Sequence, residues 1–213
     1  MKTFVRLVFG ICLVWTSAIL AADFQEGVNY TRIEPEPPQG KVGDPIEVNE
    51  FFMFSCPHCY HFEPYVLEWL KSKPEDVEFV RVPAMFGRSN NLHGQAYYAL
   101  QAMGEEARVH EAFFDEIHKK RNRLLTREAL DKFIASQGVD MQKFEEAMSS
   151  FAVAAKTNRA AALMRRYDIR GVPSLVVDGR YKSGNGLTFQ DMPKLVDYLA
   201  EKVRQERKAA AGQ

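Results

Sequence analysis

The spacing of apolar residues changes twice along the chain. β-Branched and aromatic residues crowd PIEVNEFFMF at 45–54 and VEFVRVPA at 77–84, which indicates two buried strands. The segment between them, PHCYHFEPYVLEWLK, has the spacing of a helix, with Pro57 suited to its first turn and Pro64 inside it. This order predicts a parallel strand–helix–strand unit with a right-handed crossover.

Helical spacing then continues without strand signals from about Ser89 to Tyr167. Strand signals return in SLVVDGRYK at 174–182, where Asp178-Gly179 predicts a hairpin turn. A last amphipathic helix follows, and its polar end, KVRQERKAAAGQ, is expected to fray. The pattern therefore predicts an α/β domain formed by residues 22–88 and 168–213, interrupted by a helical insertion at 89–167.

The N-terminal residues have a different composition. Lys2 and Arg6 precede an apolar run of 14 residues, 7–20, and the small residues Ala21 and Ala22 follow it. This is the plan of a secretory signal peptide, which we expect to comprise residues 1–21. A single membrane anchor is the alternative, but the run is shorter than the roughly 20 residues that span a bilayer.

Charge and cysteine content narrow the function further. The chain has 28 basic and 28 acidic residues, and loss of Lys2 and Arg6 would leave 28 − 2 = 26 basic residues against 28 acidic ones. Without a basic stripe, no nucleic-acid partner is predicted. Of the three cysteines, Cys12 would leave with the signal peptide, so Cys56 and Cys59 remain. One close pair in an exported chain is not a disulfide-stapled scaffold.

The pair Cys56-Pro57-His58-Cys59 has several possible uses. A c-type haem site needs His directly after the second cysteine, where this chain has Tyr60. Zinc needs about four ligands, and no further cysteine is available, although a metal-binding carrier remains an alternative. The other histidines, which we expect to be surface or core residues, are His61, His93, His110 and His118. A disulfide between Cys56 and Cys59 would close too short a ring to stabilise much chain.

Thiol–disulfide exchange fits the pair better. Cys56 precedes a predicted helix, whose unpaired N–H groups and dipole favour a negatively charged sulfur. A protonated His58 would add positive charge nearby. Both effects lower the pKa of Cys56 and populate its thiolate, the attacking species. Cys59 lies one helical turn further on, where it should be more buried and able to attack a mixed disulfide at Cys56.

The chain resembles the DsbA family of bacterial periplasmic thiol–disulfide oxidoreductases over essentially its whole exported length. The residues that carry the resemblance are Glu50-Phe51-Phe52, Cys56-Pro57-His58-Cys59 with Tyr60, Phe62 and Glu63, and Gly171-Val172-Pro173-Ser174. The resemblance implies a thioredoxin fold with an inserted all-helical domain. It implies a periplasmic enzyme without a dissociable cofactor, which introduces disulfide bonds into exported proteins by exchange with its Cys56–Cys59 disulfide. Pro57 and His58 are implied to make the pair a better oxidant of other proteins.

The resemblance also assigns residues outside the cysteine motif. It implies a cis peptide bond between Val172 and Pro173, in a loop whose backbone binds an extended substrate. Glu50 becomes a buried acid beneath Cys59 that relays a proton, instead of a strand residue exposed by alternation or by an edge position. Glu63 is a further candidate for that role, with a solvated helix position as the alternative.

The expected partners follow from the same resemblance. They are unfolded or partly folded exported proteins with free cysteines, and a DsbB-type membrane quinone reductase that re-oxidises the pair. The short N-terminus and balanced charge fit a monomer. A disulfide isomerase or reductase is the nearest alternative, but such isomerases generally carry a dimerisation region before the catalytic domain. Met85 and Phe86 follow the second core strand, where they would either accept unfolded chains or pack under the helical block.

Overall fold

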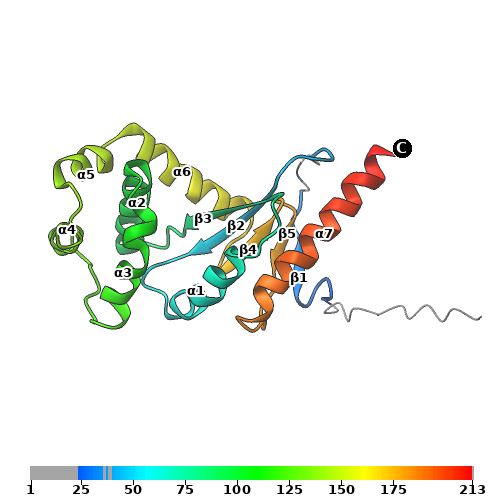
Figure 1. Cartoon of the computed structure of the whole chain (residues 1–213), viewed down its shortest axis with the longest axis horizontal. Helices are drawn as coiled ribbons and strands as arrows, with labels where there is room; N and C mark the ends of the chain where they lie inside the picture. The colour runs from blue at the N-terminus through cyan, green and yellow to red at the C-terminus, as the bar shows by residue number, and fades with distance from the viewer. Residues whose placement is uncertain (1–23, 36, 38–39, 213) are drawn as a thin grey trace, which may run out of the picture.

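A mixed five-stranded sheet, in the order β1-β5-β4-β2-β3, forms the centre of the fold (Figure 1). The computed structural model describes residues 24–35, 37 and 40–212, so the expected signal peptide and Cys12 lie outside the described residues. The strands are β1 (Tyr30–Arg32), β2 (Ile46–Phe52), β3 (Val77–Pro83), β4 (Ser174–Val177) and β5 (Tyr181–Ser183). Strands β2 and β3 are parallel and the other neighbours are antiparallel.

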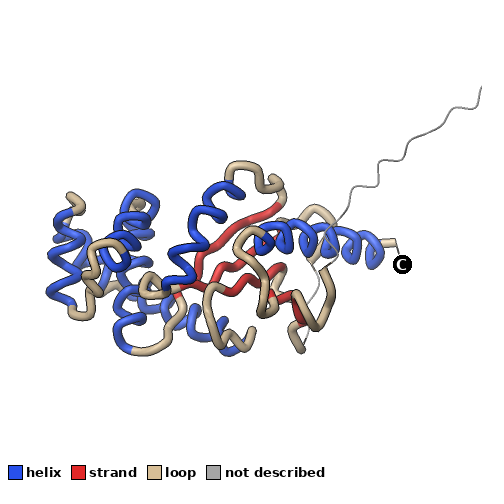
Figure 2. The backbone as a smooth tube through the Cα atoms, turned by 90° about the horizontal axis from the view of Figure 1, so that it is seen from below, coloured by secondary structure: helices blue, strands red, loops and turns tan. Residues whose placement is uncertain are grey.

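Helices connect and flank these strands as the apolar spacing predicts. Helix α1 (Pro57–Leu70) joins β2 to β3, and α7 (Asp191–Ala211) follows β5. Between β3 and β4 lie α2 (Arg88–Met103), α3 (Glu106–His118), α4 (Arg127–Ser136), α5 (Met141–Met148) and α6 (Phe151–Arg166). Figures 1 and 2 show α2 to α5 gathered beyond one end of the sheet, while the C-terminus lies at the opposite end. Within the described part of the chain, no helix has the length and apolar character needed to cross a membrane.

The two faces of the sheet belong to two hydrophobic clusters. Helices α1 and α7 cover the face that carries Ile46 and Val48, and Phe62, Val66 and Leu195 pack there. Helix α6 packs over the other face, where Ala160 and Met164 join the cluster that holds Phe51 and Val176. Because side chains alternate along a strand, Glu50 of β2 faces the same side as Val48, towards α1.

Turn and cap residues set the ends of several elements as expected. Asp178 (φ 55°) and Gly179 (φ 64°) both adopt the left-handed conformation that a tight hairpin between β4 and β5 requires. Thr126 caps α4 by accepting a hydrogen bond from the Ala129 N–H, and Asp140 caps α5 in the same way. The strand–helix–strand unit, the helical block and the hairpin are therefore present where the pattern predicts them.

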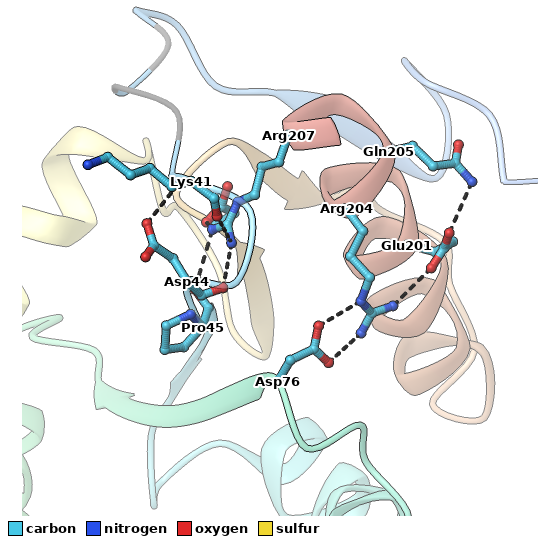
Figure 3. A network of polar contacts seen from close by, with 9 residues as sticks. Lys41, Asp44, Pro45, Asp76, Glu201, Arg204, Gln205 and Arg207 are labelled. Carbon is cyan, nitrogen blue, oxygen red and sulfur yellow. Dashed lines mark hydrogen bonds and ion pairs between the residues drawn. The ribbon is translucent and has the colours of Figure 1, made fainter. Parts of the chain in front are cut away.

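The prediction that the last helix frays is wrong. Helix α7 continues to Ala211, and Val203 and Arg207 in its second half are buried. The Arg207 guanidinium donates hydrogen bonds to the backbone carbonyls of Lys41, Asp44 and Pro45, which Figure 3 shows. It also pairs with the Asp178 carboxylate at 2.8 Å. These contacts tie the C-terminal helix to the loop before β2 and to the hairpin, which a polar sequence does not reveal.

Candidate active site

The cysteine pair lies at the N-terminal end of α1, directly after β2. Cys56 is the N-cap residue, with an extended backbone (φ −89°, ψ 118°), and Pro57 is the first helical residue. Pro57 and His58 are exposed, whereas Cys59, one turn into the helix, is 1% exposed. Both cysteines are free thiols, and both are buried, with 8% of the surface of Cys56 exposed. The motif therefore places one slightly exposed cysteine at the helix end and a fully buried one behind it.

The environment of Cys56 favours its thiolate. A hydrogen bond from the Cys59 thiol is the main cause that lowers the pKa of Cys56 to about 6. Burial opposes this shift, and hydrogen bonds from the backbone N–H groups of Cys59 and His58 support it. The charge of His58 acts in the same direction with a smaller effect. The helix N-terminus and His58 thus lower the pKa of Cys56 as predicted. The largest contribution to the lowered pKa comes from Cys59, which the sequence did not indicate.

Cys59 is affected in the opposite direction. Burial raises the pKa of Cys59 far above its ordinary value, and the hydrogen bond to Cys56 and the negative charges of Cys56 and Glu50 add to this effect. Cys59 therefore stays a thiol while Cys56 is ionised. The surroundings of the two sulfurs therefore give them different roles. Cys56 is the stable anion, and Cys59 must gain or lose a proton whenever the disulfide breaks or forms.

Glu50 is buried beneath this pair, with 1% of its surface exposed. Burial raises the pKa of Glu50 to about 7, although the charge of Arg81 opposes the shift. Arg81 is the register partner of Glu50 on β3, and its Nε lies 3.3 Å from Glu50 Oε2. A carboxyl group that changes its ionisation near neutral pH is suited to exchange a proton with a neighbouring thiol.

The contacts of Arg81 extend beyond Glu50. Arg81 Nη2 donates to Glu63 Oε1 at 2.6 Å, so Glu63 is a buried, paired residue of α1 and not a solvated one. Glu63 Oε2 lies 3.5 Å from His110 Nε2, and His110 Nδ1 lies 3.1 Å from Glu106 Oε1. Burial tends to raise the pKa of Glu63, but the contact with His110 and the charges of His110 and Arg81 outweigh it and lower that pKa.

The loop before β4 approaches the exposed side of the pair. The peptide bond between Val172 and Pro173 is cis, as the resemblance implies. Cys56 Sγ lies 3.5 Å from the Val172 carbonyl oxygen, which accepts a hydrogen bond from Cys56 when this residue is protonated, and the contact joins residues far apart in the sequence. A polar groove beside this loop is lined by residues 168–174 and 182–185, together with Gly27, Val28 and Thr31.

Met85 and Phe86, for which the sequence left two alternatives open, have different surroundings. Met85 packs partly against the hydrophobic core, and its N–H donates to Met164 Sδ, whereas Phe86 is 38% exposed.

Arg81 and His110 belong to the site but were not predicted from the sequence as site residues. Arg81 is a charged residue inside the apolar strand VEFVRVPA, and it lies opposite Glu50 in the parallel pair of strands. This position could have identified Arg81 as a partner of Glu50. His110 carried no signal beyond its place on a helix.

No group of three or more His, Cys, Asp or Glu side chains in the described part of the chain could hold a metal ion. The site is instead built from two unequal thiols, a buried carboxyl group and a backbone loop within reach of one sulfur. Together with the sheet and its helical insertion, this defines a thiol–disulfide oxidoreductase of the thioredoxin class.

Comparison with known proteins gives the family. Residues 47–200 match the model of the DSBA-like thioredoxin domain. The chain is 41% identical over 189 residues to the thiol:disulfide interchange protein DsbA of Pseudomonas aeruginosa, covering 88% of this chain and 89% of that one. It is 40% identical over 210 residues to DsbA of Azotobacter vinelandii, covering 93% and 98% of the two chains. The chain belongs to the DsbA family.

Solved structures of the family agree in fold. The crystal structure of Pseudomonas aeruginosa DsbA matches with a TM-score of 0.76 and 39% identity, covering 91% of this chain and 99% of that one. DsbA of Xylella fastidiosa matches with a TM-score of 0.75 and 32% identity, covering 85% and 97%. The predicted thioredoxin fold with a helical insertion is confirmed, and the protein is an enzyme that acts on other proteins by thiol–disulfide interchange.

Proposed function

We propose that this enzyme works in the periplasm as an oxidase, and that it introduces disulfide bonds into unfolded or partly folded exported proteins. The observation that carries the proposal is the unequal pair of thiols, in which Cys56 is stabilised as a thiolate and Cys59 is not. A stable thiolate is a good leaving group, so the reduced enzyme is favoured and its disulfide is a strong oxidant. The signal-peptide pattern of residues 1–21 supports export.

The reaction begins with the Cys56–Cys59 disulfide. A substrate thiolate attacks Cys56 Sγ, a mixed disulfide forms, and Cys59 leaves with the electron pair of the broken S–S bond. The protonated Glu50 carboxyl group gives its proton to the Cys59 sulfur. A second substrate thiolate then attacks the substrate sulfur of the mixed disulfide and releases Cys56 as a thiolate. The substrate loses two electrons as it gains its disulfide, and the enzyme ends as a dithiol.

The loop of Val172 and Pro173 is the proposed binding site for the substrate backbone. The Val172 carbonyl oxygen lies 3.5 Å from Cys56 Sγ, so a chain joined to Cys56 would run beside it. Pro173 has no N–H that would compete for the groups of an extended substrate. Pro57 and His58 are exposed at the helix end, where they would face the same substrate, and His58 helps to stabilise the Cys56 thiolate.

Turnover requires an oxidant for the reduced pair. We propose a DsbB-type membrane quinone reductase as that partner, and a monomer as the working state. The division into residues 22–88 and 168–213 with an insertion at 89–167 is supported by helices α2 to α6, which span Arg88 to Arg166 between β3 and β4. A disulfide isomerase or reductase would use the same two sulfurs, and the oxidation assay below distinguishes these activities.

Oxidised protein is expected to form disulfides in a reduced, unfolded polypeptide with matching loss of its own disulfide. We expect Glu50→Gln to slow the reaction at pH 7 by about a hundred-fold, because proton transfer to Cys59 loses its donor. Glu47→Gln is the matched control, since Glu47 lies on the same strand but on the opposite face of the sheet. The measurement is the rate of enzyme reduction in a stopped-flow experiment.

Two results would contradict the proposal. If the oxidised protein formed no disulfides in the polypeptide and only reduced existing ones, the enzyme would not be an oxidase. If Glu50→Gln and Glu47→Gln both reacted at the wild-type rate, Glu50 would have no part in proton transfer.

A further inference from the structure

His110 lies in the helical insert, yet its ring faces the charged groups beneath the cysteines. It is 6% exposed on α3. One ring nitrogen lies 3.5 Å from a Glu63 carboxylate oxygen and the other lies 3.1 Å from a Glu106 oxygen. Neither contact has the geometry of a hydrogen bond, so both are ion-pair contacts. A neutral imidazole would give neither carboxylate a compensating charge, whereas a protonated ring places a positive charge between them. The two contacts therefore fit an imidazolium.

Aromatic rings and a small set of titratable groups surround His110. The aromatic rings of Phe52, Phe54 and Phe114 lie 5.5, 5.1 and 5.3 Å from it, centroid to centroid. The titratable and charged groups that face it are Glu106 of α3, Glu63 of α1, Arg81 of β3, Tyr97 of α2 and, beyond Arg81, Glu50 of β2. Burial tends to lower the pKa of His110, but its contacts with the Glu106 and Glu63 carboxylates outweigh burial and raise that pKa.

The charge of the His110 imidazolium lowers the free-energy cost of ionising Glu50. With His110 charged, the cations Arg81 and His110 balance the carboxylates Glu63 and Glu106, and ionisation of Glu50 adds one uncompensated charge. With a neutral side chain in place of His110, Arg81 alone would face all three carboxyl groups. Ionisation of Glu50 would then leave two uncompensated negative charges in a buried cluster, which is much less favourable.

We propose that His110 is a positioning residue for thiol exchange: its positive charge neutralises Glu63, which leaves Arg81 available to the Glu50 carboxylate. The inference rests on the proposed role of Glu50 as the proton-exchange partner of Cys59. It makes the helical insert part of the redox site, because α3 supplies a charge that the thioredoxin part of the fold does not.

The step most sensitive to this charge is attack by Cys59. When Cys59 resolves a mixed disulfide at Cys56, the Glu50 carboxylate takes the thiol proton and becomes a carboxylic acid. The resulting Cys59 thiolate forms the S–S bond with Cys56 and releases the other thiolate. Glu50 must be ionised beforehand, so a group that keeps Glu50 protonated moves this step to higher pH.

The first experiment measures that step directly. Reduced protein is mixed with a saturating excess of oxidised glutathione, and the rate of the second step, in which Cys59 releases glutathione, is followed between pH 5 and pH 9. We expect His110→Gln to move the midpoint of the pH profile upward by about one unit and to slow the step at pH 7 about ten-fold. His93→Gln is the matched control, because His93 is equally buried in the insert and its ring bonds only to the Leu124 carbonyl.

The comparison separates two kinds of failure. If Glu50→Gln alters the pH profile but His110→Gln matches the wild type or the His93→Gln control, the inference about His110 is wrong and the role of Glu50 stands. If Glu50→Gln itself leaves the profile unchanged, the proposed proton exchange is wrong, and the role of His110 falls with it.

A second experiment needs no substitution at His110. Because the coupling between two charges is reciprocal, removal of the Glu50 charge must affect the titration of His110 as His110 affects that of Glu50. We expect NMR titration of the imidazole to show a lower pKa for His110 in Glu50→Gln than in the wild type. Equal His110 titrations in the two proteins would overturn the proposal even if His110→Gln did not fold.

Discussion

Replacement of Cys56 by serine is expected to lower the rate of disulfide transfer by roughly three orders of magnitude or more. The hydroxyl group of serine cannot form a disulfide and remains protonated at neutral pH, so neither the mixed disulfide nor the leaving thiolate can exist. The local environment sharpens this expectation, because the structure stabilises one specific thiolate, that of Cys56. The assay is oxidation of a reduced, unfolded polypeptide by the oxidised protein.

Cys59→Ser provides the complementary result. Cys56 would still react with a substrate disulfide, but no second thiol would be present to resolve the product, so mixed disulfides through Cys56 should accumulate. Mass spectrometry after acid quenching would detect them. Transfer at the wild-type rate by Cys56→Ser would show that Cys56 is not required. Accumulation of adducts on Cys59 in Cys56→Ser, without adducts on Cys56 in Cys59→Ser, would show that the roles of the two sulfurs are reversed.

Arg207→Ala is expected to destabilise the protein by about 3–5 kcal/mol, the largest effect predicted for a residue away from the cysteines. Arg207 is 5% exposed, and the substitution would leave the Asp178 side chain, which is 12% exposed, without this cation. The carbonyls of Lys41, Asp44 and Pro45 would lose their donor as well. Gly40 fits tightly against this guanidinium, since a β-carbon there would lie 2.8 Å from Arg207 Cζ. Urea unfolding of the reduced protein gives the free energy.

Arg204→Ala is the matched control on the same helix. Arg204 pairs with both Asp76 oxygens at 2.7 Å, but the pair is partly exposed, with 25% and 46% of the two side chains accessible (Figure 3). An ion pair of this kind contributes about 0–1 kcal/mol. Similar losses for the two variants would contradict the claim that burial of Arg207 anchors α7.

The sequence predicted the elements whose signals are local. The strand–helix–strand unit depends on β-branched runs on either side of a helical spacing, and the hairpin depends on Asp178-Gly179. Both are present, as is the position of Cys56 at a helix start. These features are determined by neighbours in the sequence, so the pattern was sufficient to find them.

The parts that the sequence did not predict depend on contacts between distant residues. Arg207 stabilises the end of α7 through Asp44, 163 residues away in the chain, and Asp178, 29 residues away, so the polar sequence of that helix was misleading. His110 meets Glu63 only because α3 of the insert packs against α1. Even the main contribution to the thiolate of Cys56, the hydrogen bond from Cys59, depends on side-chain geometry that the CPHC spacing alone does not give.

The unequal ionisation of the two thiols can be measured by the thiolate absorbance of the reduced protein as a function of pH. A single thiolate, absent from Cys56→Ser, is expected to appear with a pKa of about 6, so that Cys56 is mostly ionised at pH 7 while Cys59 remains protonated. A Cys56 pKa near the free-cysteine value of about 8.5, or two thiols that ionise together, would show that the two thiols are not unequal in this way.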